Sequence, residues 1–90
     1  MESKLQRKVI QHLENHGWYV LKVVSSNKPG HPDISAFKNG VVLFIELKDK
    51  GKQPSELQKF RIEELRKQGF VCWVIDDFVN MKSRLIYFEI

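Results

Sequence analysis

The sequence predicts one small α/β domain, and three observations support this prediction. The 90 residues are 42% hydrophobic and 29% charged, which is typical of a globular chain and not of a disordered one. Two segments carry apolar residues at helical spacing, and several others alternate or run apolar as strands do. An Asn-Gly dipeptide at 39–40 lies between two of these strands and is the preferred sequence of a two-residue hairpin turn. Without repeats or linkers to divide it, the sequence predicts a single domain over residues 1–90.

The helices are predicted from apolar spacing and from glycines that stop them. Residues 2–16 form the first helix, with apolar residues every four positions, and Gly17 ends it. Residues 55–68 form the second helix, and Gly69 ends it. The side of this helix that we expect to face the core consists of Leu57, Phe60 and Leu65.

The strands are predicted from aromatic and β-branched residues between turn signals. They cover residues 18–24, 33–38, 41–48, 70–75 and 85–90, and the last follows a polar turn over residues 76–84. Residues 41–45 are apolar on both faces, which indicates a central strand covered on both sides. The predicted order is α-β-β-β-α-β-β, a mixed central sheet flanked by helices.

Charge and cysteine content limit the function classes. The net charge of +4 suits a polyanionic partner. Cys72 is the only cysteine, so no intrachain disulfide can form, and we expect it to be a small buried residue. The three histidines lack the spacing of a zinc site. The charged start is unlike a signal peptide, and no apolar run approaches the roughly 20 residues of a membrane span. We therefore expect a reducing, cytoplasmic setting with no membrane contact.

The hairpin turn predicts which residues face one another. Lys38 pairs with Val41 across the turn, and each outward step keeps the paired numbers summing to 79. Asp33 then lies opposite Glu46, with Cβ atoms about 4.5–5.5 Å apart. Two carboxylates placed in this way repel one another, unless one has a raised pKa or a cation lies between them.

Lys48 follows Glu46 by two residues and therefore lies on the same face of the strand. Two carboxylates favour a hard divalent cation, which polarises a phosphate and activates water. An ammonium group beside them would orient that water or stabilise charge developing on phosphorus. The same residues also fit a turn aspartate and a weak surface ion pair, so the pattern alone leaves both interpretations open.

The spacing of these residues resembles a known nuclease signature. Pro32-Asp33, twelve residues and then Glu46-Leu47-Lys48 match the PD-(D/E)xK pattern, and the predicted order resembles the restriction-endonuclease-like core of that superfamily. Within it, the chain is most similar to the VRR-NUC (virus-type replication-repair nuclease) domain. The matching stretches are Glu2 with the first helix and Gly17, Gly30-His31-Pro32-Asp33, residues 44–48, Ser55-Glu56-Leu57-Gln58 and Gly69.

The resemblance implies roles for these residues. Asp33 and Glu46 would be metal ligands, the backbone carbonyl of Leu47 a third, and Lys48 the catalytic lysine. The ion would be Mg²⁺ or Mn²⁺, and no small-molecule cofactor is expected. The implied activity is structure-selective endonucleolytic cutting of branched DNA, as by a Holliday-junction resolvase.

Two further residues match the family at the edge of its motif. Glu2 matches a helix glutamate that completes such metal sites, and Gln58 matches a glutamine that points toward the active site. Each also has a simpler explanation, because a carboxylate favours the start of a helix and Ser55 with Gln58 forms a capping box. His31 precedes a proline in a loop, where exposure is more common than general-base catalysis.

Basic residues flank the predicted site, and we expect them to contact phosphates without reading sequence. They are Lys22, Lys28, Lys50 and Lys52. The resemblance implies a homodimer. We expect the last strands to provide its interface, through Trp73, Phe78, Tyr87 and Phe88. The same resemblance leaves open whether the protein is encoded by a phage. The alternatives are a non-catalytic nucleic-acid-binding module with a vestigial site and a plain interaction domain.

Overall fold

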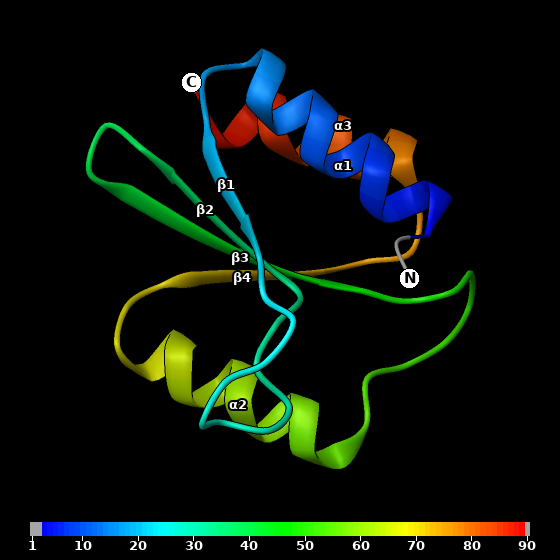
Figure 1. Ribbon diagram of the computed structural model, residues 1–90, viewed down its shortest axis with the longest axis vertical. Coiled ribbons are helices and arrows are strands. Elements are labelled where there is room, and N and C mark those ends of the chain that lie inside the picture. The colour runs from blue at the N-terminus through cyan, green and yellow to red at the C-terminus, as the bar shows by residue number, and fades with distance from the viewer. Residues whose placement is uncertain (1–2, 90) are drawn as a thin grey trace.

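The computed structural model, described here over residues 3–89, is a mixed four-stranded sheet between helices (Figure 1). The sheet order is β1-β2-β3-β4, in which β1, β2 and β3 are antiparallel neighbours and β4 runs parallel to β3. Helices α1 and α3 lie on one face of the sheet, and α2 lies on the other. The elements are α1 (Lys4–Asn15), β1 (Tyr19–Lys22), β2 (Ile34–Lys38), β3 (Val41–Leu47), α2 (Glu56–Lys67), β4 (Val71–Ile75) and α3 (Phe78–Phe88).

The hairpin of β2 and β3 has the predicted register. Lys38 pairs with Val41 and Ile34 with Ile45, so the paired numbers sum to 79 throughout. Asn39 and Gly40 both have positive φ, 50° and 78°, which a type I′ turn requires at its two central residues. One step beyond the last paired residues, the same register brings Asp33 opposite Glu46.

The core lies between the sheet and the α1/α3 layer. It combines buried residues of both helices with alternate residues of β2, β3 and β4, namely Val9, Leu13, Trp18, Ile34, Ala36, Leu43, Ile45, Ile75, Met81 and Leu85. Because side chains alternate along a strand, the even-numbered residues of β3 point to the opposite face, on the side of α2. Phe44 and Glu46 therefore lie on that side.

The C-terminal segment is a helix, so the predicted turn over residues 76–84 and strand over residues 85–90 are wrong. Asp77 caps α3, and its side chain accepts a hydrogen bond from the backbone N–H of Asn80 at 2.9 Å. Met81 and Leu85 are one helical turn apart and are both buried in the core. Their spacing follows the helical period, whereas the apolar residues at the end of the chain predict a strand.

The packing side of α2 also differs from the prediction. Ile62 is its buried residue, whereas Leu57 and Phe60 are exposed. Among the strands, α2 packs mainly against β4, so it covers only part of the sheet. Leu57 instead packs closely on Gly30, in the loop before β2. A Cβ atom added to Gly30 would lie only 2.9 Å from Leu57 Cγ.

The aromatic residues of the last segments pack mostly inside the subunit. The ring of Phe88 lies 6.1 Å from that of Trp18 and 5.4 Å from that of Trp73, and Phe78 contacts the ring of His12 at 5.6 Å. Tyr87 is freely exposed. Three of the four residues expected at a dimer interface thus have partners within the chain. Cys72 is buried, as predicted.

The helices of residues 3–89 are all too short or too polar to cross a membrane.

Replacing Gly30 by alanine should destabilise the fold much more than the same change at Gly40. Both glycines have positive φ, 85° and 78°, which costs alanine about 1–2 kcal/mol. At Gly30 the new methyl group would also meet the backbone and side chain of Leu57, adding roughly 1–3 kcal/mol, whereas nothing lies within 4 Å at Gly40. Urea unfolding of both variants measures the difference, and equal losses would contradict the close approach of this loop to α2.

Candidate active site

Asp33 is held at the start of β2 by bonds to both neighbouring strands. Its carbonyl accepts a hydrogen bond from the N–H of Val23 at 2.8 Å. Its carboxylate oxygen Oδ2 accepts one from the N–H of Leu47, also at 2.8 Å. These bonds fix the carboxylate beside the end of β3, and the bond from Leu47 uses one of its two oxygens.

Glu46 is the most buried charged residue of the described chain, with 1% of its surface exposed. Its Oε1 atom is buried and has no hydrogen-bond partner among residues 3–89. Burial, and then the negative charge of Asp33, raise the pKa of this carboxyl to about 7, although the positive charge of Lys48 partly offsets both. A buried carboxylate with an unused oxygen is costly unless something binds it.

Lys48 supplies the positive charge of the site. Its Nζ lies 3.6 Å from Glu46 Oε2, and its side chain is mostly buried. Its backbone N–H donates to the carbonyl of Ile75 at 2.9 Å, which ties the end of β3 to the end of β4. The structure therefore brings together Asp33, Glu46 and Lys48, as the sequence predicted.

A cavity of about 530 Å³ lies against this group. One wall consists of Asp33, Leu47, Lys48 and Asp49, and the other is the start of α1, from Ser3 to Gln6. Sequence reasoning missed the exposed Lys4 in this wall. The signal was present, because Ser3 caps α1 by accepting a bond from the Gln6 N–H at 3.0 Å, which sets where the helix begins.

The residues of this site fit a divalent cation. Glu46 offers an oxygen with no hydrogen-bond partner among residues 3–89, Leu47 bonds one of the two oxygens of Asp33, and the negative charge of Asp33 disfavours the charged form of Glu46. Residues 3–89 contain no cluster of three or more His, Cys, Asp or Glu side chains that would hold a metal alone. Mg²⁺ commonly takes one or two carboxylates and completes its shell with water and substrate phosphate. The predicted ligand Glu2 lies outside the described residues.

Gln58 makes both bonds of a capping box. The Ser55 N–H donates to Gln58 Oε1 at 2.8 Å, and the Gln58 N–H donates to Ser55 Oγ at 3.2 Å. The side-chain oxygen is therefore used to start α2, while the amide nitrogen takes no part in the cap. A catalytic role for Gln58 stays a prediction, and such a role would have to use that nitrogen.

Two substitutions separate these roles of Gln58. Gln58→Glu keeps an oxygen that accepts the Ser55 N–H, so the free energy of unfolding should stay within about 0.5 kcal/mol, whereas Gln58→Ala should lose about 1 kcal/mol. If the amide nitrogen serves catalysis, both variants should lose DNA cleavage equally. Cleavage by Gln58→Glu at the wild-type rate would leave the residue as a helix cap.

The predicted DNA-binding lysines lie in different surroundings. Lys50 and Lys52 follow the site in the exposed loop after β3, and Lys50 Nζ lies 3.7 Å from Asp77 Oδ1. Lys22 ends β1 at the edge of the sheet, and Lys28 lies in the loop before β2. These cations are therefore spread along one end of the sheet and do not form a single cluster.

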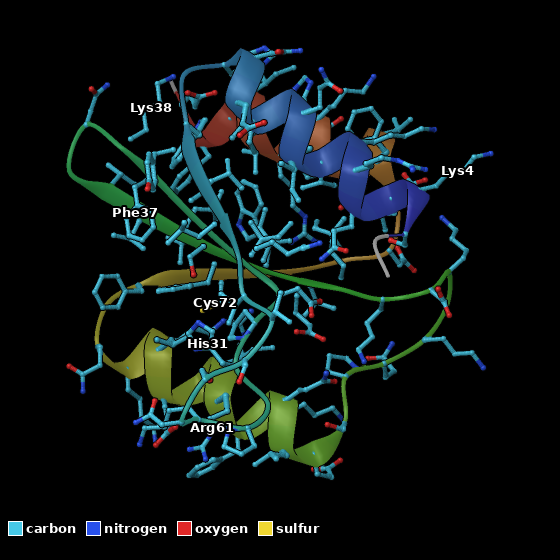
Figure 2. All side chains as sticks on the ribbon, viewed as in Figure 1. Lys4, His31, Phe37, Lys38, Arg61 and Cys72 are labelled. Carbon is cyan, nitrogen blue, oxygen red and sulfur yellow. The ribbon has the colours of Figure 1, made fainter. Side chains whose placement is uncertain are left out.

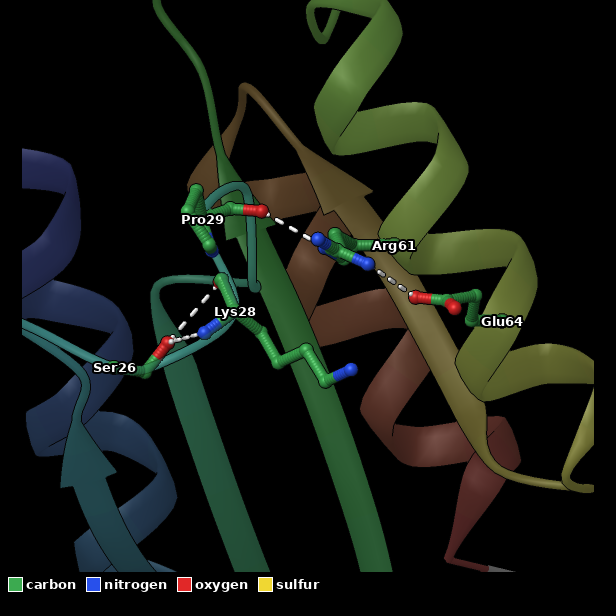
Figure 3. A network of polar contacts seen from close by, with 5 residues as sticks. All are labelled: Ser26, Lys28, Pro29, Arg61 and Glu64. Carbon is green, nitrogen blue, oxygen red and sulfur yellow. Dashed lines mark hydrogen bonds and ion pairs between the residues drawn. The ribbon is translucent and has the colours of Figure 1, made fainter.

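The loop before β2 is fixed to α2 (Figure 3). Arg61 Nε donates to the carbonyl of Pro29 at 2.9 Å, and its Nη1 pairs with Glu64 at 2.8 Å. Ser26 and Lys28 close a turn in the same loop through the Ser26 hydroxyl. Arg61 was not singled out from the sequence, because its partner is a backbone carbonyl with no sequence signature.

His31 packs against the sheet. Its ring lies 5.5 Å from that of Phe44 in an edge-on arrangement, and burial lowers the pKa of the imidazole. Figure 2 shows His31 between the sheet and α2. Packing on Phe44 accounts for this histidine without a general-base role.

Comparison with known proteins agrees with this geometry. The profile of the family described as "Archaeal holliday junction resolvase (hjc)" matches residues 2–73. A solved structure titled "VRR_NUC domain" is 27% identical, covers 93% of this chain and 92% of its own, and superposes with a TM-score of 0.85. A "VRR_NUC domain protein", at 23% identity, 94% and 84% coverage and a TM-score of 0.77, has the same fold. No curated protein sequence matches.

The resemblance to VRR-NUC domains of the PD-(D/E)xK superfamily is thereby confirmed. The matched segment, residues 2–73, contains the hairpin, Asp33, Glu46, Lys48 and Gln58. It excludes α3, the element that the sequence mispredicted. This chain is a nuclease domain that acts on DNA, and it belongs to the archaeal Holliday junction resolvase family.

Proposed function

We propose that this domain is a divalent-metal-dependent endonuclease that cuts branched DNA by shape. One observation carries the proposal: Glu46 is buried beside the carboxylate of Asp33 and the ammonium of Lys48, and its Oε1 has no hydrogen-bond partner among residues 3–89. A non-catalytic binding module would gain nothing from this costly arrangement. A nuclease uses it to hold an ion and a phosphate together.

Each residue has a distinct task in this proposal. Asp33 and Glu46, with the carbonyl of Leu47, would hold Mg²⁺ or Mn²⁺, and Glu2 is a further candidate. The ion, when bound, polarises the scissile phosphate and lowers the pKa of water. The ammonium of Lys48, 3.6 Å from Glu46 Oε2, would stabilise negative charge developing on the phosphate oxygens.

Shape selection would follow from the cations along this end of the sheet. Lys22, Lys28, Lys50 and Lys52 would contact phosphates, which position the duplex but carry no sequence information. The loop over residues 49–54 is too short for extensive base contacts. A junction needs two paired cuts, and a two-fold symmetric homodimer would provide two sites.

The direct test uses end-labelled four-way junction and linear duplex of the same sequence. With Mg²⁺ or Mn²⁺ we expect paired cuts in the junction and little cutting of the duplex, and with EDTA no cutting. Junction binding without cleavage in either ion would favour the alternative, a binding module with a vestigial site. Equal cutting of both DNAs would contradict shape selection.

Replacing Lys48 by methionine should slow junction cleavage about 100- to 1000-fold at saturating DNA. The change removes the charge but keeps a long apolar stem, so binding of the junction should change little. Single-turnover cleavage and a binding titration in Ca²⁺ measure the two effects. Lys67→Met, an exposed position at the end of α2, is the matched control and should cleave normally. A loss confined to binding would contradict this role for Lys48.

A further inference from the structure

A strip of cationic side chains leads away from the active-site cavity across α1 and α3. Lys4, Lys8 and His12 follow one another at four-residue spacing on α1, so they lie on one face of that helix, about 6 Å apart along its axis. Lys82, on the neighbouring α3, completes the strip. We name this surface the α1–α3 basic strip, and it consists of Lys4, Lys8, His12 and Lys82.

The ring of Phe78 brings the cations of the two helices together. Lys8 Nζ lies 5.9 Å and Lys82 Nζ lies 5.0 Å from the centre of this ring, both within the range of a cation–π interaction. The ring of His12 meets the same ring edge-on at 5.6 Å. Lys8, His12 and Phe78 also line one hollow of about 220 Å³. The cations therefore have fixed places around one aromatic side chain.

The positive charges at Phe78 lack partners among the described residues. Neither of the two lysines at this ring forms an ion pair with any residue of 3–89. The carboxylates at the two ends of α3 already have lysine partners from other elements. Asp77 Oδ1 lies 3.7 Å from Lys50 Nζ, and Glu89 Oε2 lies 2.5 Å from Lys38 Nζ. The α1–α3 basic strip is thus a surface of unbalanced positive charge.

The effect of this crowding is visible at His12. Burial, and then the positive charges of His16 and Lys82, lower the pKa of its imidazole, and Glu89 offsets only part of this. The rings of His12 and His16 are 4.2 Å apart. Like charges that are gathered without a counter-charge destabilise the folded chain, and an anion bound across them removes that cost. The arrangement therefore favours an anionic partner.

The strip begins at the cavity in which DNA would be cut. Lys4 forms part of the cavity wall, and Figure 2 labels it at the start of α1. The loop after β3 is bonded to the segment before α3, because the Gly51 N–H donates to Asp76 Oδ2 at 2.9 Å. Figure 1 shows α1 and α3 side by side, with both helices beginning at this end of the molecule. A DNA backbone that leaves the cavity can therefore continue over both helices.

We propose that the α1–α3 basic strip binds the phosphate backbone of a DNA arm that leaves the cleavage site over these two helices. The distance from Lys4 to His12 is about 12 Å along α1, which corresponds to about three to four base pairs of DNA. Lys28 lies on the α2 side, where it lines a cavity with Arg61, so the strip would be a separate surface for phosphates. This inference rests on the proposed function for the position of the cut.

The test is binding of a four-way DNA junction in EDTA, which keeps the DNA uncut. Lys8→Met/Lys82→Met removes two charges but keeps both apolar stems on Phe78. The dissociation constant should rise at least about tenfold, and the slope of its logarithm against the logarithm of salt concentration should fall by about 2, since each phosphate contact contributes about 0.9. The matched control, Lys59→Met/Lys67→Met, removes the same charge from α2 and should change the dissociation constant less than about threefold.

A second variant separates charge from structure. Lys8→Arg/Lys82→Arg keeps both charges and should bind the junction as wild type does, and urea unfolding establishes that each variant is folded. At saturating DNA with Mg²⁺, the double methionine variant should cut at the wild-type rate, because neither lysine lines the active-site cavity.

Three results would overturn the proposal. One is equal weakening by the α2 control, which would assign the effect to net charge. Another is an unchanged salt slope in the double methionine variant. The third is binding by the arginine variant as weak as that of the methionine variant. Because binding is measured without metal, a protein that binds through the strip but never cuts would refute the nuclease alone. Normal cutting and normal binding by the methionine variant would refute the strip alone.

Discussion

Replacing Asp33 by asparagine should lower the rate of junction cleavage by about 1000-fold or more. The amide oxygen of asparagine can still accept the hydrogen bond that Leu47 donates to Asp33 at 2.8 Å, so the local geometry is kept. What disappears is the negative charge that an ion beside Glu46 would need. Single-turnover cleavage of a labelled junction in Mg²⁺ measures the loss, and repeating it in Mn²⁺ tests whether a softer ion restores part of the rate.

The control for this prediction is Glu14→Gln, which removes a negative charge from an exposed position on α1. It should cut at the wild-type rate, because no described feature of the site involves that residue. Binding of the Asp33→Asn protein to the junction should be unchanged or tighter, since a negative charge near phosphate has been removed. A cleavage rate of the Asp33→Asn protein within tenfold of the wild-type rate would contradict the metal-dependent mechanism.

Replacing Glu46 by glutamine should stabilise the metal-free protein at high pH while abolishing cleavage. The pKa of Glu46 is raised from 4.5 to about 7 in the folded state. Between these values the unfolded chain releases the proton that the folded chain keeps, so the free energy of unfolding falls as pH rises. By pH 8 this loss is complete and amounts to about 3 kcal/mol, which the glutamine variant does not suffer.

Urea unfolding in EDTA at several pH values measures this difference. Glu46→Gln and wild type should be equally stable near pH 4.5 and should diverge up to pH 8, with the variant more stable. Added Mn²⁺ should stabilise wild type at pH 8 but not the variant, because the ion binds the ionised carboxylate. A difference in stability that stays constant across pH would show that the pKa of Glu46 is not raised in the folded protein. Equal stabilisation of both proteins by Mn²⁺ would show that Glu46 does not bind the ion.

The parts that sequence predicted well depend on contacts close along the chain. The pairing of Asp33 with Glu46 follows from a two-residue turn and from strand alternation, both of which are local rules. Lys48 then follows from the two-residue period of a strand. The central site could therefore be derived before any tertiary structure was known.

The parts that sequence missed depend on packing between distant elements. Which side of α2 is buried was mispredicted, because α2 rests on one edge strand and on the loop around Gly30. The segment from Phe78 is a helix and not the predicted turn and strand, and Asp77, which caps this helix, is the local signal for it. The burial of Glu46 arises from elements around it, and no pattern within the strand reveals it.

The type I′ turn at Asn39 and Gly40 also explains the length of the spacer in the nuclease motif. A hairpin can lengthen by one residue in each strand and still hold Asp33 against Glu46. A single added residue would shift one strand by one step and turn its side chains to the opposite face. The number of residues between Asp33 and Glu46 can therefore change only in steps of two.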